Sequence, residues 1–153
     1  MPSFQRLFIE SKGQPIIHNG QTIQMVDRLL VKNEQHLRLI FESIKAEWRQ
    51  GVHLSTDGDF IVNDMTVKKA VVLWHDTAPK EVLIQVHTKK GECFVKNVWD
   101  SGNGTMDSWH NGAAMIVEDI VSGKRYRCND GQPDDDFDDI IFRLEILEAT
   151  PLL

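Results

Sequence analysis

The most regular hydrophobic pattern along the chain lies between Asn33 and Gln50. Five apolar residues recur there at intervals of three and four, a spacing that places them on one face of an α-helix: Leu37, Ile40, Phe41, Ile44 and Trp48. Asn33 is suited to cap the start of such a helix and Gly51 to end it. The pattern predicts one long amphipathic helix whose apolar stripe packs on a sheet.

A different pattern follows the Asp57-Gly58 pair, where short runs rich in valine, isoleucine and aromatic residues indicate β-strands. The predicted strands are Phe60–Asn63, Val67–His75, Glu81–His87, Cys93–Trp99, Ala113–Asp119, Lys124–Cys128 and Ile140–Leu147. Their connections are mostly short enough to join antiparallel neighbours directly, which predicts a meander.

The N-terminal region is predicted to form a hairpin. Phe4–Ile9 and Gln21–Val31 are its candidate strands, and the Asn19-Gly20 pair between them favours the positive-φ turns that close hairpins. Together with the single long helix, these strands predict an α+β fold, an antiparallel meander sheet packed against the helix. The length of 153 residues is typical of one domain, so residues 1–153 are expected to form one.

The composition is close to that of an average globular protein, with 41% hydrophobic and 26% charged residues. The longest apolar runs, such as Ala70–Trp74, are far shorter than the roughly 20 residues that a bilayer span requires. The first ten residues lack the continuous apolar stretch of a secretory signal. We therefore expect a cytoplasmic protein without membrane contact, in which Cys93 and Cys128 are reduced core residues.

Charge is distributed unevenly along the chain. Residues 1–99 carry 11 acidic and 13 basic side chains, whereas residues 100–153 carry 12 acidic and 4 basic ones. The acidic excess is densest in a segment that we call the aspartate run: Asp130, Asp134, Asp135, Asp136, Asp138 and Asp139. Such a segment is either a solvated loop or a surface that meets a cationic partner. Arg125 and Arg127 precede it and are candidates to pair with its carboxylates.

The long connection from Asp100 to Gly112 is the second candidate site, because connections of this length are often functional. It contains Trp109 and His110. Trp109 either folds back to fill an open end of the core or anchors a partner.

Catalytic, nucleotide-binding and metal-binding motifs are absent from the sequence. It has no G-x-S-x-G, no P-loop, no H-E-x-x-H and no C-x-x-C, and the aspartate run lacks the glycine of an EF-hand loop. We therefore expect no metal and no cofactor. Nucleic-acid binding is disfavoured, because lysine and arginine form only small local clusters.

These observations favour a non-catalytic protein that binds a basic partner through the aspartate run, with Trp109 and His110 nearby. In size, acidity and lack of a catalytic motif, the chain resembles the immunity proteins of bacterial toxin systems, including contact-dependent inhibition. The resemblance implies a protein that blocks a toxin nuclease domain. The alternatives are a small hydrolase, with His110 as general base and Asp100 or Asp107 orienting it, and a structural subunit of a larger assembly.

Overall fold

A computed structural model describes residues 4–108, 112–132 and 136–147. One short helix, α1, spans Phe4–Glu10 and is followed by strands only. The strands are β1 (Ile16–His18), β2 (Gln21–Ile23), β3 (Asp27–Leu30), β4 (Gln35–Ile44), β5 (Arg49–Val62), β6 (Met65–Trp74), β7 (Glu81–His87), β8 (Glu92–Asp100), β9 (Ala114–Ile120), β10 (Gly123–Asn129) and β11 (Ile140–Leu147).

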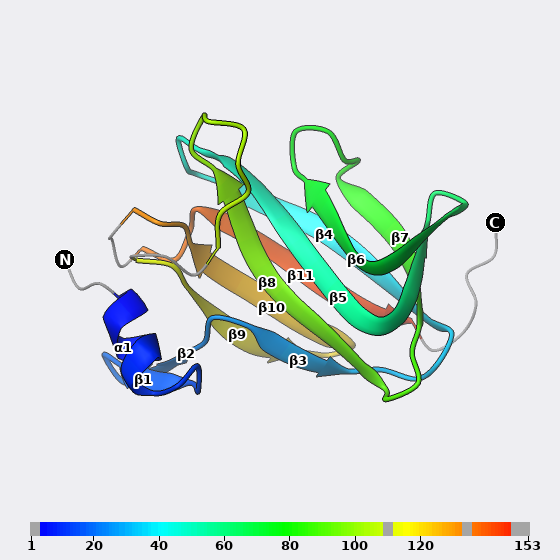
Figure 1. The fold of residues 1–153 in the computed structure, drawn as a ribbon, viewed down its shortest axis with the longest axis horizontal. Helices are drawn as coiled ribbons and strands as arrows, with labels where there is room; N and C mark the ends of the chain where they lie inside the picture. The colour runs from blue at the N-terminus through cyan, green and yellow to red at the C-terminus, as the bar shows by residue number, and fades with distance from the viewer. Residues whose placement is uncertain (1–3, 109–111, 133–135, 148–153) are drawn as a thin grey trace.

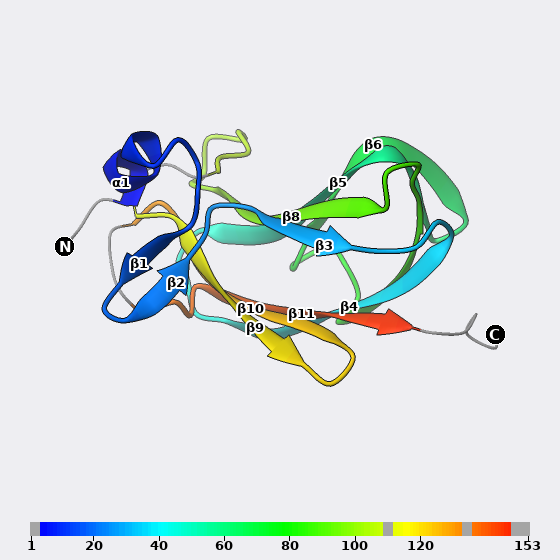
Figure 2. The same cartoon turned by 90° about the horizontal axis from the view of Figure 1, so that it is seen from below.

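Nine of these strands form one antiparallel sheet in the order β3-β8-β5-β7-β4-β11-β10-β9, and β6 pairs along β5. Figure 2 shows that the sheet folds into two layers, with β3, β8, β5 and β6 in one and β4, β11, β10 and β9 in the other. The end strands approach each other, because Gln24, just before β3, exchanges two backbone hydrogen bonds with Met115 of β9 at 2.9 and 2.7 Å. The result is a nearly closed, barrel-like sheet (Figure 1).

The predicted helix over Asn33 to Gln50 is wrong. This segment forms β4, a tight connection and the start of β5, and β4 lies between β7 and β11. Leu37, Leu39 and Phe41 alternate along β4 and are buried. That period of two fits a strand, and pairing on both edges favours it over the helical reading of the same residues. The protein is mostly β, so the α+β class with one long helix is corrected.

The N-terminal hairpin exists, but its first strand is not Phe4–Ile9. The hairpin consists of β1 and β2, with Asn19 at φ 50° and Gly20 at φ 78° in the turn. Phe4–Ile9 instead belongs to α1. Phe4 and Phe8 are four residues apart, share one face of the helix, and are buried. They pack in a small separate cluster with Ile23, Ala114, Ile116 and Phe137.

The strands from Phe60 onward occur close to the predicted positions, yet they do not form a simple meander. Only the hairpins β5-β6, β9-β10 and β10-β11 join sequence neighbours within the large sheet. β5 bends between Ser55 and Asp59, and its edge changes partner there from β8 to β7. Gly58 permits the bend, because a Cβ atom at this position would lie 2.0 Å from the carbonyl oxygen of His87.

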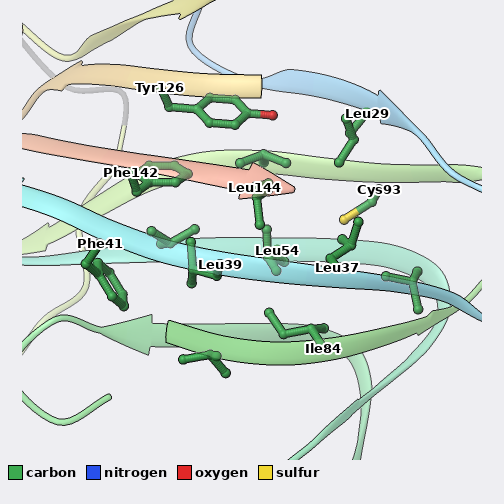
Figure 3. Packing of buried hydrophobic residues seen from close by; sticks show 14 of the residues in the cluster. Leu29, Leu37, Leu39, Phe41, Leu54, Ile84, Cys93, Tyr126, Phe142 and Leu144 are labelled. Carbon is green, nitrogen blue, oxygen red and sulfur yellow. The ribbon is translucent and has the colours of Figure 1, made fainter. Parts of the chain in front are cut away.

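Side chains from both layers fill the space between them (Figure 3). Tyr126 of β10 stacks on Phe142 of β11, with ring centroids 4.8 Å apart. Leu37 and Leu39 of β4 and Leu54 of β5 point into the same interior. The side chains of Cys93 and Cys128 are buried thiols, as predicted for core residues.

Candidate functional site

Four loops lie at one end of the barrel-like sheet, and we call this region the acidic end. They are residues 45–48, 75–80, 101–113 and 130–139, and strand pairing brings their bases to the same end of the sheet. The described residues of these four loops include seven acidic residues and two lysines. Loops 31–34, 63–64, 88–91 and 121–122 at the opposite end carry two acidic residues and three lysines. The sheet is therefore electrostatically polar from end to end.

Two members of the aspartate run, Asp130 and Asp139, are buried at 1% and 6% exposure. Oδ2 of Asp139 accepts a hydrogen bond from the backbone N–H of Asp130 at 2.9 Å. Asp130 in turn accepts hydrogen bonds from the side-chain amide of Gln50 and the backbone N–H of Gln132, each at 2.9 Å. These two carboxylates therefore shape the loop and lie beneath its surface.

Burial raises the pKa of the Asp130 carboxyl, and the charge of nearby Glu47 adds to the effect. The hydrogen bonds from Gln132 and Gln50 oppose it. Gln50 is fully buried, and its Oε1 has no hydrogen-bond partner in the described part of the chain. A buried network of this kind holds the β10-β11 loop against the start of β5.

Phe137 anchors the middle of the β10-β11 loop. Its side chain is 4% exposed and lies 6.0 Å from the ring of Phe4 in α1. The backbone N–H of Phe137 donates to Oδ1 of Asn129 at 2.7 Å. Because this aromatic residue points inward, its neighbours Asp136 and Asp138 are exposed and half-buried, respectively. Among the described aspartates of the run, only these two reach the surface.

The other predicted site residues, Asp134, Asp135, Trp109 and His110, lie outside the described residues.

Asp100 and Asp107, the two candidates to orient His110, both have local structural contacts. Oδ1 of Asp100 accepts hydrogen bonds from the backbone N–H groups of Gly102 and Gly104 at 2.8 and 3.2 Å. The backbone of Asp107 exchanges two hydrogen bonds with Trp99. In the described residues, the Asp100 carboxylate therefore closes the turn that follows β8.

In the described residues, Arg125 and Arg127 pair with glutamates of the neighbouring strands, whereas the sequence made the carboxylates of the aspartate run candidate partners. Arg125 donates to Glu42 at 3.1 Å and to Glu118 at 3.0 Å, and Arg127 lies 3.3 Å from Glu118. Further pairs extend the set across β4, β7, β9, β10 and β11, and we call it the ion-pair ladder. Its members are Arg38, Glu42, Glu81, Glu118, Arg125, Arg127, Arg143 and Glu145.

A groove on the outer face of β5 and β8 was not predicted from the sequence. Its volume is about 390 Å³, and it is lined by Met25, Val26, His53, Ser55, Phe94 and Lys96. The residues come from three separate segments, so only the strand register brings them together. The alternation along β8, with Cys93 and Val95 buried and Phe94 and Lys96 outward, was the available signal.

Within the described residues, no three His, Cys, Asp or Glu side chains gather closely enough to hold a metal ion. In the same residues, no helix is long and apolar enough to cross a membrane.

Comparison of the chain with protein-family models, curated proteins and solved structures gives no match.

Proposed function

We propose that this is a non-catalytic binding protein whose acidic end covers a basic protein partner. The observation that carries the proposal is the charge polarity of the barrel-like sheet. The described residues of loops 45–48, 75–80, 101–113 and 130–139 at one end include seven acidic residues and two lysines, whereas the loops at the other end carry two acidic residues and three lysines. A field of this kind steers a cationic partner and accelerates association.

The aspartate run contains both buried and surface carboxylates, and this difference supports the proposal. Asp130 and Asp139 hold the loop in shape through hydrogen bonds, and Phe137 fixes it to the cluster around α1. Asp136 and Asp138 flank the anchored Phe137 in the described part of the loop, and holding them in place lowers the entropic cost of binding.

The partner class that fits this chemistry is a basic, nucleic-acid-binding protein domain, since such domains expose clustered lysine and arginine. An immunity protein that blocks a toxin nuclease domain has this requirement, and we propose that role in the cytoplasm. The buried thiols of Cys93 and Cys128 are compatible with a reducing compartment.

The experiment compares the natural protein with a variant in which Asp134, Asp135, Asp136 and Asp138 are changed to Asn. Asp130 and Asp139 are kept, because their carboxylates are part of the buried network. The partner is captured from the native host, and binding kinetics are measured at low and high salt. The variant should fold normally, associate about tenfold more slowly at low salt and show a flatter salt dependence.

A matched control removes four exposed acidic charges elsewhere, through Glu10→Gln, Glu34→Gln, Asp64→Asn and Asp119→Asn. Its association rate should stay much closer to that of the natural protein. Equal slowing by both variants would reduce the effect to net charge alone, and an unchanged rate for the aspartate variant would refute the proposed surface.

A further inference from the structure

The groove on the outer face of β5 and β8 contains two basic side chains side by side. His53 of β5 lies directly opposite Lys96 of β8 in the strand register. Both residues are partly buried, and both line the same half-open hollow. The pair therefore places one ammonium group and one titratable imidazole inside a depression.

Neither side chain has an acidic partner among the described residues. The ammonium of Lys96 donates to the neutral hydroxyl of Ser108 at 3.3 Å. On its other edge, His53 faces Val72 of β6, and Met25 and Val26 reach the groove from the segment before β3. Lys96 is thus the charged group that faces His53 from the elements packed around it.

Two carboxylates in a neighbouring hollow are engaged elsewhere. A second hollow of about 300 Å³ continues past Ser55 and Phe94, and Asp57 and Glu92 line it. Asp57 accepts a hydrogen bond from the hydroxyl of Thr88 at 2.6 Å and caps the β7-β8 turn through backbone N–H groups. Glu92 is paired with Arg28. Within the described residues, the ammonium of Lys96 is therefore left without a paired carboxylate.

Both His53 and Lys96 have lowered pKa values, so each is less readily protonated than in water. Burial lowers the pKa of His53, and repulsion from Lys96 lowers it further. Burial also lowers the pKa of the Lys96 ammonium. An anion placed between them would stabilise the charged forms of both side chains.

Apart from Ser55, the remaining walls of the groove are apolar. Phe94 of β8 is 38% exposed, and Met25 and Val26 line the groove with it. A hollow of about 390 Å³ lies within the size range of small-molecule sites, which combine apolar walls with a few polar groups.

We propose that this groove binds a small organic anion, with its carboxylate between Lys96 and His53 and its apolar body against Phe94, Met25 and Val26. The inference does not depend on the proposed partner, although Ser108 of loop 101–113 contacts Lys96. Ser55 adds a hydroxyl group to the lining for a further hydrogen bond.

The test uses phenylacetate as the anionic probe and phenylethanol as its neutral counterpart of similar shape, each titrated into the full chain and followed by NMR. Phenylacetate should shift the resonances of His53 and Phe94 and raise the pKa of His53. Phenylethanol should bind at least about tenfold more weakly, because it forms no charge-assisted hydrogen bond. Phenylacetate affinity should rise as the pH falls and His53 becomes protonated.

Lys96→Met should weaken phenylacetate binding by about tenfold or more while leaving phenylethanol binding unchanged. The matched control, Lys89→Met, removes an exposed lysine at the opposite end of the sheet and should have no comparable effect. The pKa measurement on the natural protein needs no variant to fold. Absence of shifts at His53 and Phe94, equal binding of both probes, or an equal loss in the two lysine variants would each overturn the proposal.

Discussion

On the outer face of β4, β10 and β11, arginines and glutamates alternate across the strands, whereas the groove on β5 and β8 holds Lys96 and His53 with no carboxylate among its described lining residues. In the ladder, Arg125 lies directly opposite Arg143, and Glu42 lies between them at 3.1 and 3.5 Å. In the groove, Lys96 lies directly opposite His53, and no described acidic side chain fills the equivalent place.

The difference separates two uses of charge on one sheet. The ladder compensates its like-charged neighbours internally, so its residues stabilise cross-strand pairing and need nothing from outside. In the groove, no described carboxylate compensates the charge of Lys96 beside His53. Uncompensated, partly buried charge costs stability, and natural proteins retain such costs mainly where a ligand or partner is bound. The groove, unlike the ladder, therefore has a charge that a ligand can compensate.

The largest effect is expected at the seam between the two layers of the sheet, where β3 contacts β10. Asp27 of β3 is 4% exposed and accepts hydrogen bonds from the hydroxyl of Tyr126 at 2.8 Å and the ammonium of Lys124 at 3.2 Å. Asp27→Ala would leave both donors without their acceptor, so the free energy of unfolding should fall by about 3 kcal/mol in a urea titration. Exposed Asp119 is the control, and Asp119→Ala should change it by less than about 0.5 kcal/mol. A similar small loss for Asp27→Ala would show that the seam does not depend on this carboxylate.

Charge reversal compares the ladder and the groove directly. Glu42→Lys would place a third cation beside Arg125 and Arg143. The free energy of unfolding should fall by about 1–2 kcal/mol in the same titration. Lys96→Glu breaks no ion pair of the described residues and places a carboxylate beside His53, so stability should change by less than about 0.5 kcal/mol. Losses of equal size would mean that the ladder and the groove do not differ in compensation.

Most strands could be read from the sequence, because their alternation is local. The runs Glu81–His87 and Ile140–Leu147 were predicted with the bounds that the structure has. The order of strands could not be read in this way. The bend of β5 between Ser55 and Asp59 and its change of partner depend on contacts between distant segments, and short connections wrongly favoured a meander.

The two misassigned segments show why period alone was insufficient. Residues 37, 40, 41 and 44 fit a helical stripe, and residues 37, 39 and 41 of the same segment fit a strand. Pairing with β7 and β11 decided between them. For α1 a signal was present, since Phe4, Leu7 and Phe8 have helical spacing.

The candidate site was predictable as a segment and not in its detail. Charge counting located the aspartate run, yet nothing in six similar aspartates indicates that Asp130 and Asp139 face inward while Asp136 faces solvent. That division depends on Gln50 and Phe4, which are distant in sequence. His53 and Lys96 are separated by more than 40 residues, so their pairing follows from the strand register alone.

The smallest effect concerns the pH dependence of stability, and it tests whether the groove is uncompensated. Burial and Lys96 hold the pKa of His53 below its ordinary value of 6.5 in the folded protein. The unfolded chain then binds more protons than the folded one as the pH falls through 6.5, so His53 makes the folded state less stable on the acidic side.

In urea titrations at pH 7 and pH 5, His53→Gln should lose less stability on acidification than the natural protein. Lys96→Met should lie between the two, because it removes the repulsion and leaves the burial. Saturating phenylacetate should reduce the acid loss of the natural protein and not that of His53→Gln. If His53→Gln and the natural protein lose equal stability between the two pH values, His53 is not held in its neutral form, and the contrast between groove and ladder fails at this residue.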